Sequence, residues 1–482
     1  MEELQLPDLA LQSSVEKDAL IRELWPLRSR VTSLQEEVAS LTIEVAKLKA
    51  RLALKSHNSS KPPSTDGLGK PAPKPKSLRI AGQKPPGGQK GHAGHTLMRV
   101  DSPDHIEKHR PIATCDDCNS KLPEGVLVET RQVFDLPVLR HEVTEHQVWE
   151  SKCSCGKVHR GTFPPDVKAA VQYGPRIKAA AVCLTDNHMM PLNRTGQVLG
   201  DFFDLPMSDG TIQACKEEAA SLLSPTVDLI GKACQAAPVL HADETGMRVA
   251  GKLHWLHIYA TLILTFVACH AKRGAEAFKE LGILPDYMGT LIHDGWKPYR
   301  ELLCKHGLCN AHHLRELTFQ FEEMSQAWAG KMITLLVAAC HEVGTVAGSL
   351  PADRIAYYQS AYEQILTEGE AANPRAPPIP GKKGKTAQSK GFNLLSRLRT
   401  YKDDVWRFAT DPTVPFTNNV AEQAARMNKV KQKIAGCFRT KKGIDNYCIN
   451  RSYMATMHKQ GANVYESIVL VFMGKTPQPK FA

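Results

Sequence analysis

The chain has 482 residues, too many for one ordinary domain, and a hydrophobic content of 42%, enough to form a buried core. It carries 61 lysines and arginines against 50 acidic residues, and the resulting net charge of +11 favours a polyanionic partner. Its longest apolar run, residues 256–269, is interrupted by polar residues and too short to span a bilayer, which excludes an integral membrane protein.

Two further features indicate a cytoplasmic protein. The first ten residues, MEELQLPDLA, are acidic and lack the apolar core of a signal peptide. The thirteen cysteines are odd in number and mostly scattered, which is typical of reduced thiols. We therefore expect a soluble, multidomain protein with no membrane partner.

Residues 27–52 carry an unbroken heptad repeat of aliphatic side chains. The repeat consists of Leu27, Val31, Leu34, Val38, Leu41, Val45, Leu48 and Leu52. Valine mostly at position a and leucine at d predicts a parallel two-stranded coiled coil, and Pro26 is expected to limit the helix on its N-terminal side. A helix packed on the protein's own core is the alternative. We assign residues 1–55 to a leucine zipper that forms a homo-oligomer.

A basic segment rich in proline and glycine follows, and we assign residues 56–110 to a linker. Between Lys55 and Arg99 it holds nine lysines and arginines and one acid, Asp66. Low hydrophobicity with high charge cannot support a packed core. Both a solvated linker and a segment that lies along DNA phosphates fit this composition.

Two close cysteine pairs predict a zinc-binding module over residues 111–168. They are Cys115 with Cys118, in a CxxC spacing, and Cys153 with Cys155, in a CxC spacing. Four thiolates suit a closed, tetrahedral and structural Zn²⁺ site, whereas the alternative, a redox CxxC, needs no second pair. The stretches RQVFDLPV and HEVTEHQVWE between the pairs have the composition of short strands.

Residues 169–228 read as a helical domain. The stretch PLNRTGQVLGDFF, a turn with Pro206, and a second helix capped by Ser208 have the pattern of a helix-turn-helix. This pattern predicts DNA binding, and an ordinary helical hairpin is the alternative.

Two apolar runs then end on carboxylates. AAPVLHADETGMRV is expected to be a strand that ends at Asp243, KLHWLHIYATLILTFVACH supplies two more strands, and YMGTLIHDGWKPY ends on Asp294. Two aspartates at one sheet edge repel each other unless a cation lies between them, and Mg²⁺ or Mn²⁺ prefers such oxygen ligands. Glu244 and His293 should point to the opposite side, so we expect structural roles for them.

The third ligand is expected from a distant helix. Thr417 or Asn418 can cap a helix whose first turns contain Glu422, which a solvated helix charge would otherwise explain. Basic residues follow along this helix and suit a phosphate backbone that enters the site; the predicted DNA contacts are Arg426, Lys429, Lys431 and Lys433.

A cluster of thiols and imidazoles between these acids has no firm metal-binding spacing. Its members are Cys304, Cys309, His312 and His313. We favour packed or phosphate-adjacent histidines over a further metal site.

Together these pieces resemble the insertion sequence 66 family of DDE transposases over nearly the whole chain. The resemblance is carried by the zipper, SHNSSKPPSTDG, GGQKGHAGHTL, the two cysteine pairs, HADETGMRV with HWLH, HDGWKPY, CNAHHLREL, and FTNNVAEQAAR with KIAGCFRT. It implies an α/β fold with an RNase H-like catalytic core over residues 229–436, in which Asp243, Asp294 and Glu422 match the DDE triad. It also implies a helical insertion over about 320–410, which includes GKKGKTAQSK, and a C-terminal helical segment over 437–482.

The hypothesis is an enzyme that cuts and joins DNA by phosphoryl transfer with two Mg²⁺ ions. Its partners would be the element's terminal inverted repeats, target DNA and a second copy of the chain, with room for accessory proteins, and it would associate with the bacterial nucleoid. A metal-dependent nuclease or resolvase that cuts without joining is one alternative. A non-catalytic, zinc-containing DNA-binding regulator is another.

Overall fold

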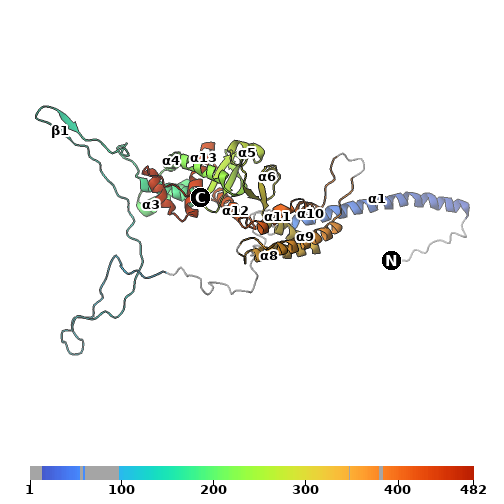
Figure 1. The fold of residues 1–482 in the computed structure, drawn as a ribbon, viewed down its shortest axis with the longest axis horizontal. Coiled ribbons are helices and arrows are strands. Elements are labelled where there is room, and N and C mark those ends of the chain that lie inside the picture. The colour runs from blue at the N-terminus through green and yellow to red at the C-terminus, as the bar shows by residue number, and fades with distance from the viewer. Residues whose placement is uncertain (1–12, 55–57, 60–96, 347, 379–383, 482) are drawn as a thin grey trace.

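The computed structural model describes residues 13–54, 58–59, 97–346, 348–378 and 384–481 (Figure 1). Most of the predicted basic linker and part of GKKGKTAQSK lie outside the described residues. Every helix in the described part of the chain is too short or too polar to cross a membrane. The fold is mixed α/β, as predicted.

A five-stranded mixed sheet lies at the centre of the α/β part. Its strands are β3 (Val239–Val249), β4 (Lys252–Ala260), β5 (Thr265–His270), β6 (Thr290–His293) and β7 (Lys305–Leu308), in the spatial order β5-β4-β3-β6-β7. The first three are the predicted strands and form an antiparallel meander, and β6 and β7 run parallel to β3. Between β5 and β7 lie the short helices α5 (Ala275–Leu281) and α6 (Lys297–Arg300).

The expectation that the first strand ends at Asp243 is wrong. β3 continues for six more residues because its pairing with β4 runs on to Val249↔Lys252. Ala250 and Gly251 close this hairpin with positive φ angles of 49° and 77°, as a two-residue hairpin turn requires. The parallel pairing of β3 with β6 does stop at His241↔Ile292, so Asp243 still lies just beyond the end of that pairing.

Helices cover both faces of the sheet. Leu240 and Tyr259 on one face pack in a core with α4 (Asp209–Ala236) and α14 (Val464–Phe472). Leu256 and Ile258 on the other face pack with α12 (Asn419–Ala435) and α13 (Lys441–Lys459). Strands that are buried on both faces read as long apolar runs, which is why these segments stand out in the sequence.

The predicted helix-turn-helix pattern is present. α3 (Leu192–Phe203) is followed by a turn and by α4, whose N-cap Ser208 accepts a hydrogen bond from the Thr211 backbone N–H. The π-helix Cys183–Asn187 and α2 (Pro175–Val182) precede them. The boundary expected at residue 228 falls inside α4, and these helices share one hydrophobic core with the sheet.

The segment predicted to be a helical insertion is helical, and it packs in one hydrophobic core with Ile292 of β6 and Leu308 of β7. It contains α8 (Ala327–Val343), α9 (Ala352–Ala372), α10 (Lys390–Thr400) and α11 (Lys402–Thr410), and α7 (Asn310–Glu322) leads into it. Trp406 lies at the centre of this core, with its ring edge-on to Tyr362.

Helix α1 (Ser14–Leu52) contains the heptad repeat, and its start differs from the prediction. A capping box of Ser13 and Glu16 begins the helix, and Pro26 lies inside it. Pro26 removes one backbone bond of a helix of 39 residues, which α1 tolerates. The eight heptad side chains are 48–77% exposed, as expected of a seam whose partner would be another chain.

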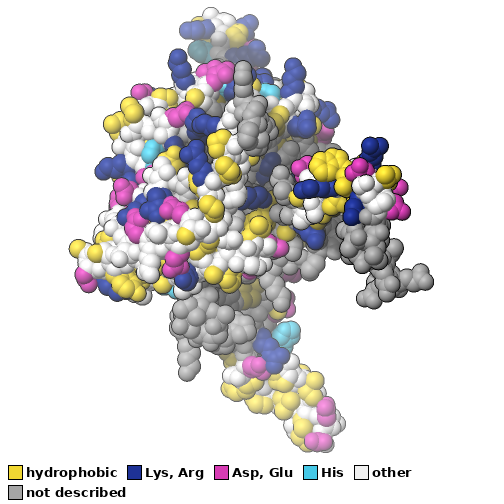
Figure 2. Space-filling view, turned by 90° about the vertical axis from the view of Figure 1, so that its right-hand side faces the viewer, with side chains coloured by type: hydrophobic (Ala, Val, Ile, Leu, Met, Phe, Trp, Pro, Cys, Tyr) yellow, Lys and Arg dark blue, Asp and Glu magenta, His cyan; other side chains and the backbone are white. Residues whose placement is uncertain are grey.

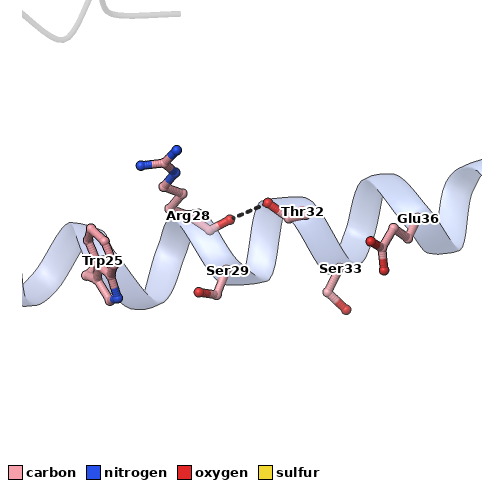
Figure 3. Close-up of a pocket in the computed structure, with 6 residues that line it drawn as sticks. All are labelled: Trp25, Arg28, Ser29, Thr32, Ser33 and Glu36. Carbon is pink, nitrogen blue, oxygen red and sulfur yellow. Dashed lines mark hydrogen bonds between the residues drawn. The ribbon is translucent and has the colours of Figure 1, made fainter.

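A shallow hollow on α1 is formed by this helix alone. Figure 3 shows its lining, in which the Thr32 hydroxyl donates to the Arg28 carbonyl at 3.1 Å.

Lysine and arginine side chains on the face shown in Figure 2 are scattered among acidic and apolar ones.

Residues 97–173 are largely extended and reach away from the sheet and its helices (Figure 1). Their strands are β1 (Glu150–Lys152) and β2 (Val158–Arg160), which form a small hairpin. The strands expected in RQVFDLPV and in most of HEVTEHQVWE are not formed. Val133 is 92% exposed, and a strand without a paired neighbour or a covering layer is not stable.

Replacing Gly196 in α3 with alanine should destabilise the helix-turn-helix. A Cβ at this position would lie 2.3 Å from the Met207 carbonyl oxygen, so α3 and the turn would have to separate. We expect a loss of roughly 1–3 kcal/mol, measured as a lower melting temperature of the full chain. Gly200→Ala is the matched control, because its nearest neighbour, Pro206 Cβ, lies at 3.4 Å. Equal stability of the two variants would contradict the close approach.

Candidate acidic site

Asp243 and Asp294 lie at matching levels of neighbouring parallel strands. The pairing ends at His241↔Ile292, and each aspartate follows two residues later on its own strand. Asp243 accepts a hydrogen bond from the Glu244 backbone N–H at 2.9 Å, and Asp294 accepts one from the Trp296 N–H at 2.8 Å. The predicted convergence of the two strands is therefore present.

Asn418 fixes the start of α12 against this edge of the sheet. It occupies the N-cap position, as expected, but its side chain does not cap the helix. Instead, its amide donates to the Ala242 carbonyl at 2.8 Å, and its side-chain oxygen pairs with His241 Nδ1 at 2.9 Å. Its backbone N–H donates to Cys309 Sγ at 3.2 Å. These contacts hold the first turn of α12, which contains Glu422, over the face of the sheet that carries Asp243.

The three acids are close enough for their charges to interact. Burial raises the pKa of Asp243 well above its ordinary value, and the charges of Glu244, Asp294 and Glu422 raise it further. Glu422 itself is only 9% exposed. The structure thus places the three carboxylates, which come from positions up to 179 residues apart, within range of one another's charges, but their oxygen atoms do not all lie within 4.8 Å of one another.

This set of groups fits a hard divalent cation. Carboxylates that are gathered and partly buried repel one another, and a cation removes that repulsion. Carboxylate oxygens are also the ligands that Mg²⁺ and Mn²⁺ prefer. Asp243, Asp294 and Glu422 could therefore hold such an ion.

Glu244 points to the opposite face of β3, as predicted. Its side chain is buried, pairs with Arg273 at 2.5 Å and accepts a hydrogen bond from the Tyr299 hydroxyl. Arg273 is stacked between the rings of Trp255 and Trp296. These contacts give Glu244 a structural role.

His293 is packed in the core, also as predicted. It is fully buried, and its ring nitrogens bond to His306 Nδ1 at 3.1 Å and to the Gly295 N–H at 3.0 Å. Burial lowers its pKa well below the ordinary range, so the ring is neutral.

Cys309 and His312 border the acidic site, which the sequence analysis did not predict. Cys309 Sγ donates to Glu422 Oε1 at 3.4 Å, and His312 Nδ1 lies 3.8 Å from the same oxygen. Arg315 and Arg426 lie 3.8 and 3.5 Å from the other oxygen, Oε2. The CxxH spacing at the start of a helix, with an arginine three residues later, is the signal that could have identified this group.

The other two members of the thiol and imidazole cluster lie apart from it. His313 is buried and bonds to Asn310 Oδ1 at 3.0 Å, and Cys304 is buried near the end of α6. The interpretation as packed residues therefore holds for these two.

Three of the four predicted DNA contacts are accessible. Arg426 has a side chain that is 66% exposed, and Lys433 is exposed as well. Lys429 is exposed and donates to the Gly246 carbonyl at 2.5 Å. These cations follow Glu422 along one helix.

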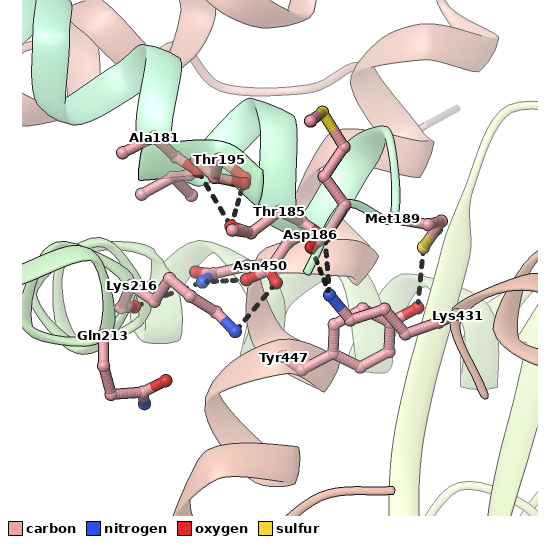
Figure 4. A network of polar contacts seen from close by, with 12 residues as sticks. Ala181, Thr185, Asp186, Met189, Thr195, Gln213, Lys216, Lys431, Tyr447 and Asn450 are labelled. Carbon is pink, nitrogen blue, oxygen red and sulfur yellow. Dashed lines mark hydrogen bonds and ion pairs between the residues drawn. The ribbon is translucent and has the colours of Figure 1, made fainter. Parts of the chain in front are cut away.

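The prediction that Lys431 contacts DNA is wrong, because its ammonium is buried. It donates to the carbonyls of Thr185 at 2.8 Å and Met190 at 3.3 Å (Figure 4). Burial lowers its pKa to about 8. On the helix, Lys431 lies on the side that faces the π-helix, which sequence spacing alone does not reveal.

Lys431 adds to a buried polar network that joins α12 and α13 to the helix-turn-helix region. Asp186 in the π-helix pairs with Lys216 of α4 at 3.0 Å and accepts a hydrogen bond from Asn450 of α13 at 3.0 Å (Figure 4). Tyr447 donates to Asn428 of α12 at 2.7 Å. Breaking any of these pairs would leave a buried charge or polar group without a partner.

The cysteine pairs each form a tight turn, and the two turns are apart. The Asn119 N–H bonds to the Cys115 carbonyl at 2.9 Å, and the Gly156 N–H bonds to the Cys153 carbonyl at 2.8 Å. No three of the four sulfur atoms lie within 4.8 Å of one another. Each cysteine pair thus lies in a hydrogen-bonded turn, and joint zinc ligation by the two pairs stays a prediction.

Comparison with known proteins identifies relatives of most of the chain. The family described as transposase IS66 family matches residues 170–446, more than half of the 482 residues. A family of unknown function matches residues 5–98. No curated protein matches the chain.

Replacing Asp243 with asparagine should stabilise the protein in the absence of divalent cations. In the folded protein the pKa of Asp243 lies well above its ordinary value of 3.8, so the folded state binds this proton more tightly than the unfolded chain does. The free energy of unfolding therefore falls as the pH rises from 3.8 through the raised pKa. At neutral pH, asparagine removes this penalty and keeps an acceptor for the Glu244 N–H. In a chelator we expect a gain of about 0.5–2 kcal/mol, seen as a higher melting temperature.

Added Mg²⁺ should raise the melting temperature of the wild type more than that of Asp243→Asn. The exposed Asp286 offers a control, because Asp286→Asn should change neither the melting temperature in chelator nor its increase with Mg²⁺. If Asp243→Asn is less stable than the wild type without cations, the inference that ionised Asp243 destabilises the folded protein is contradicted.

Proposed function

Because the chain belongs to the IS66 family of transposases, we propose that it cuts and joins DNA at a metal-dependent site formed by Asp243, Asp294 and Glu422. What most directly supports this site is the backbone geometry: Asp243 and Asp294 each follow the paired ends of β3 and β6 by two residues, and Asn418 ties the first turn of α12, with Glu422, to the same part of β3. We propose further that the sheet is an RNase H-like core, and the meander followed by two parallel strands supports that assignment.

The three carboxylates would hold two Mg²⁺ or Mn²⁺ ions. When bound, such ions activate the attacking oxygen and stabilise the leaving oxygen of an in-line phosphoryl transfer. The chain's own part is to position the ligands: the pairing of β3 with β6 sets the two aspartates, and Asn418 sets the first turn of α12. Tyr299 and Arg273 engage Glu244 and keep it on the opposite face.

DNA would approach along the exposed side of α12. Arg426, Lys429 and Lys433 lie along this helix from Glu422 onward, so they would contact phosphates near the site. The helix-turn-helix over α3 and α4 would bind the element's terminal inverted repeats, together with the basic segment 56–110. A structural Zn²⁺ ion held by the two cysteine turns would order residues 111–168.

Neutralising one acid of the site should abolish chemistry and leave DNA binding largely intact. For Asp294→Asn or Glu422→Gln we expect a loss of roughly 10³-fold or more in cleavage and joining of element-end DNA, equivalent to about 4 kcal/mol. Gel-shift binding of the same DNA measures the retained function. Glu244→Gln is the matched control, since this acid faces away, and it should lose no more than about tenfold.

Normal joining by Asp294→Asn would refute the assignment of the site. Cleavage without any joining by the wild type would favour a nuclease. Complete absence of both activities with Mg²⁺ or Mn²⁺ would favour a DNA-binding regulator.

We propose that the seam of α1 pairs two copies of the chain. Its eight aliphatic side chains are exposed along one helix, and a charge at position d of such a seam opposes association. The double variant Leu34→Glu with Leu41→Glu should therefore shift the mass in sedimentation equilibrium toward the monomer. Ser33→Glu with Ser40→Glu adds the same charge at exposed c positions, away from the seam, and should not. An unchanged mass for the seam variant would rule out this role.

A further inference from the structure

A thiol, an imidazole and a carboxylate meet beside the acidic site. Cys309 Sγ, a ring nitrogen of His312 and a carboxylate oxygen of Glu422 all lie within 4.8 Å of one another. No other group of three such side chains is this close within the part of the chain that the structure describes. Phosphoryl transfer at three carboxylates does not require the thiol or the imidazole.

We propose that Cys309, His312 and Glu422 form a separate binding site for a thiophilic divalent ion such as Zn²⁺, and that the bound ion withdraws Glu422 from the acidic site. The first part stands on the geometry of the three side chains. The second part, inhibition, rests on the proposed function.

The distances between the donor atoms match a tetrahedral ion. Bonds of about 2.3 Å to sulfur and about 2.0–2.1 Å to nitrogen and oxygen place neighbouring ligand atoms roughly 3.3–3.6 Å apart. Cys309 Sγ and His312 Nδ1 lie 3.4 and 3.8 Å from Glu422 Oε1. The thiol and a ring nitrogen of His312 lie within 4.8 Å of each other, so a rearrangement of about 1 Å or less would close the site around an ion.

The donor atoms are available to a metal. His312 Nδ1 is buried and makes no hydrogen bond with any described residue. Burial raises the pKa of Cys309 to about 12, so the thiol keeps its proton until an ion binds. The ion would replace this proton, which would leave to solvent, and the Asn418 N–H, 3.2 Å from Sγ, would help to stabilise the thiolate. Arg315 and Arg426 lie at Oε2 and leave Oε1 to the ion.

The ligand types separate this site from the acidic one. Mg²⁺ prefers six oxygen ligands in an octahedron, so a sulfur, a nitrogen and one oxygen select against it. Zn²⁺ takes all three, and a water molecule or Asp294, whose charge acts on His312, can supply the fourth ligand. Because both sites use Glu422, occupation of one disfavours occupation of the other.

Cobalt binding by the full-length protein tests the site directly. In the parent protein, serine replaces the four exposed or half-exposed cysteines of the two turns, which removes the other proposed metal site; the four are Cys115, Cys118, Cys153 and Cys155. We expect one equivalent of Co²⁺ with a thiolate-to-cobalt charge-transfer band. Cys309→Ser should abolish the band, and Cys437→Ser, at an exposed cysteine elsewhere, should leave it unchanged.

His312→Gln provides a second variant that spares the buried thiol. It should weaken Co²⁺ binding by more than about 100-fold, beyond what loss of an outer contact causes. Absence of the band in the parent, its survival in Cys309→Ser, or unchanged affinity in His312→Gln would each overturn the site. If Cys309→Ser loses its helical circular dichroism, His312→Gln alone decides.

Zinc titration of DNA cleavage tests the inhibition. At fixed Mg²⁺, Zn²⁺ should inhibit the wild-type protein, whose cysteine turns are intact, and His312→Gln in the same background should need at least about 100-fold more Zn²⁺ for the same fractional loss of its own activity. Equal inhibition of both would overturn the coupling. Cobalt binding without any Mg²⁺-dependent cleavage would refute the proposed function and leave the metal site standing, whereas cleavage without cobalt binding would do the reverse.

Discussion

The central constraint on this structure is the electrostatic repulsion among the partly buried carboxylates of Asp243, Asp294 and Glu422. Ionised Asp243 lowers the stability of the folded state most directly, because burial and its acidic neighbours raise its pKa. Rigid backbone contacts hold the acids there: the parallel pairing of β3 with β6 fixes two of them, and the bonds of Asn418 to His241 and Ala242 fix the helix that brings the third. A site held this firmly before a cation arrives needs little rearrangement to bind one.

Much of this arrangement could be predicted from the sequence because local patterns determine it. Apolar runs marked the strands, Ser208 marked the start of α4, and the period of two in a strand separated Asp243 from Glu244. The end of β3 was wrong because the hairpin with β4 extends the strand beyond its apolar part.

Features that depend on distant neighbours could not be predicted in this way. The period of a helix shows which residues share a side, but not what covers that side, so Lys431 seemed exposed although the π-helix carbonyls bury it. The CxxH spacing of Cys309 and His312 did not reveal their third partner, because Glu422 lies more than 100 residues away in the sequence. The prediction that Pro26 limits α1 was wrong because the capping box of Ser13 and Glu16 starts the helix upstream of the proline.

Helix α12 carries Glu422 near its first turn and Lys431 nine residues later, roughly 13 Å along the same rod. The end with Glu422 lies at the acidic site. Nearer the other end, Lys431 donates to the carbonyls of Thr185 in the π-helix and of Met190 just after it. A continuous helix transmits a push at either end without much bending. A displacement of the π-helix would therefore be carried along α12 to Glu422, which couples the helix-turn-helix region to the acidic site.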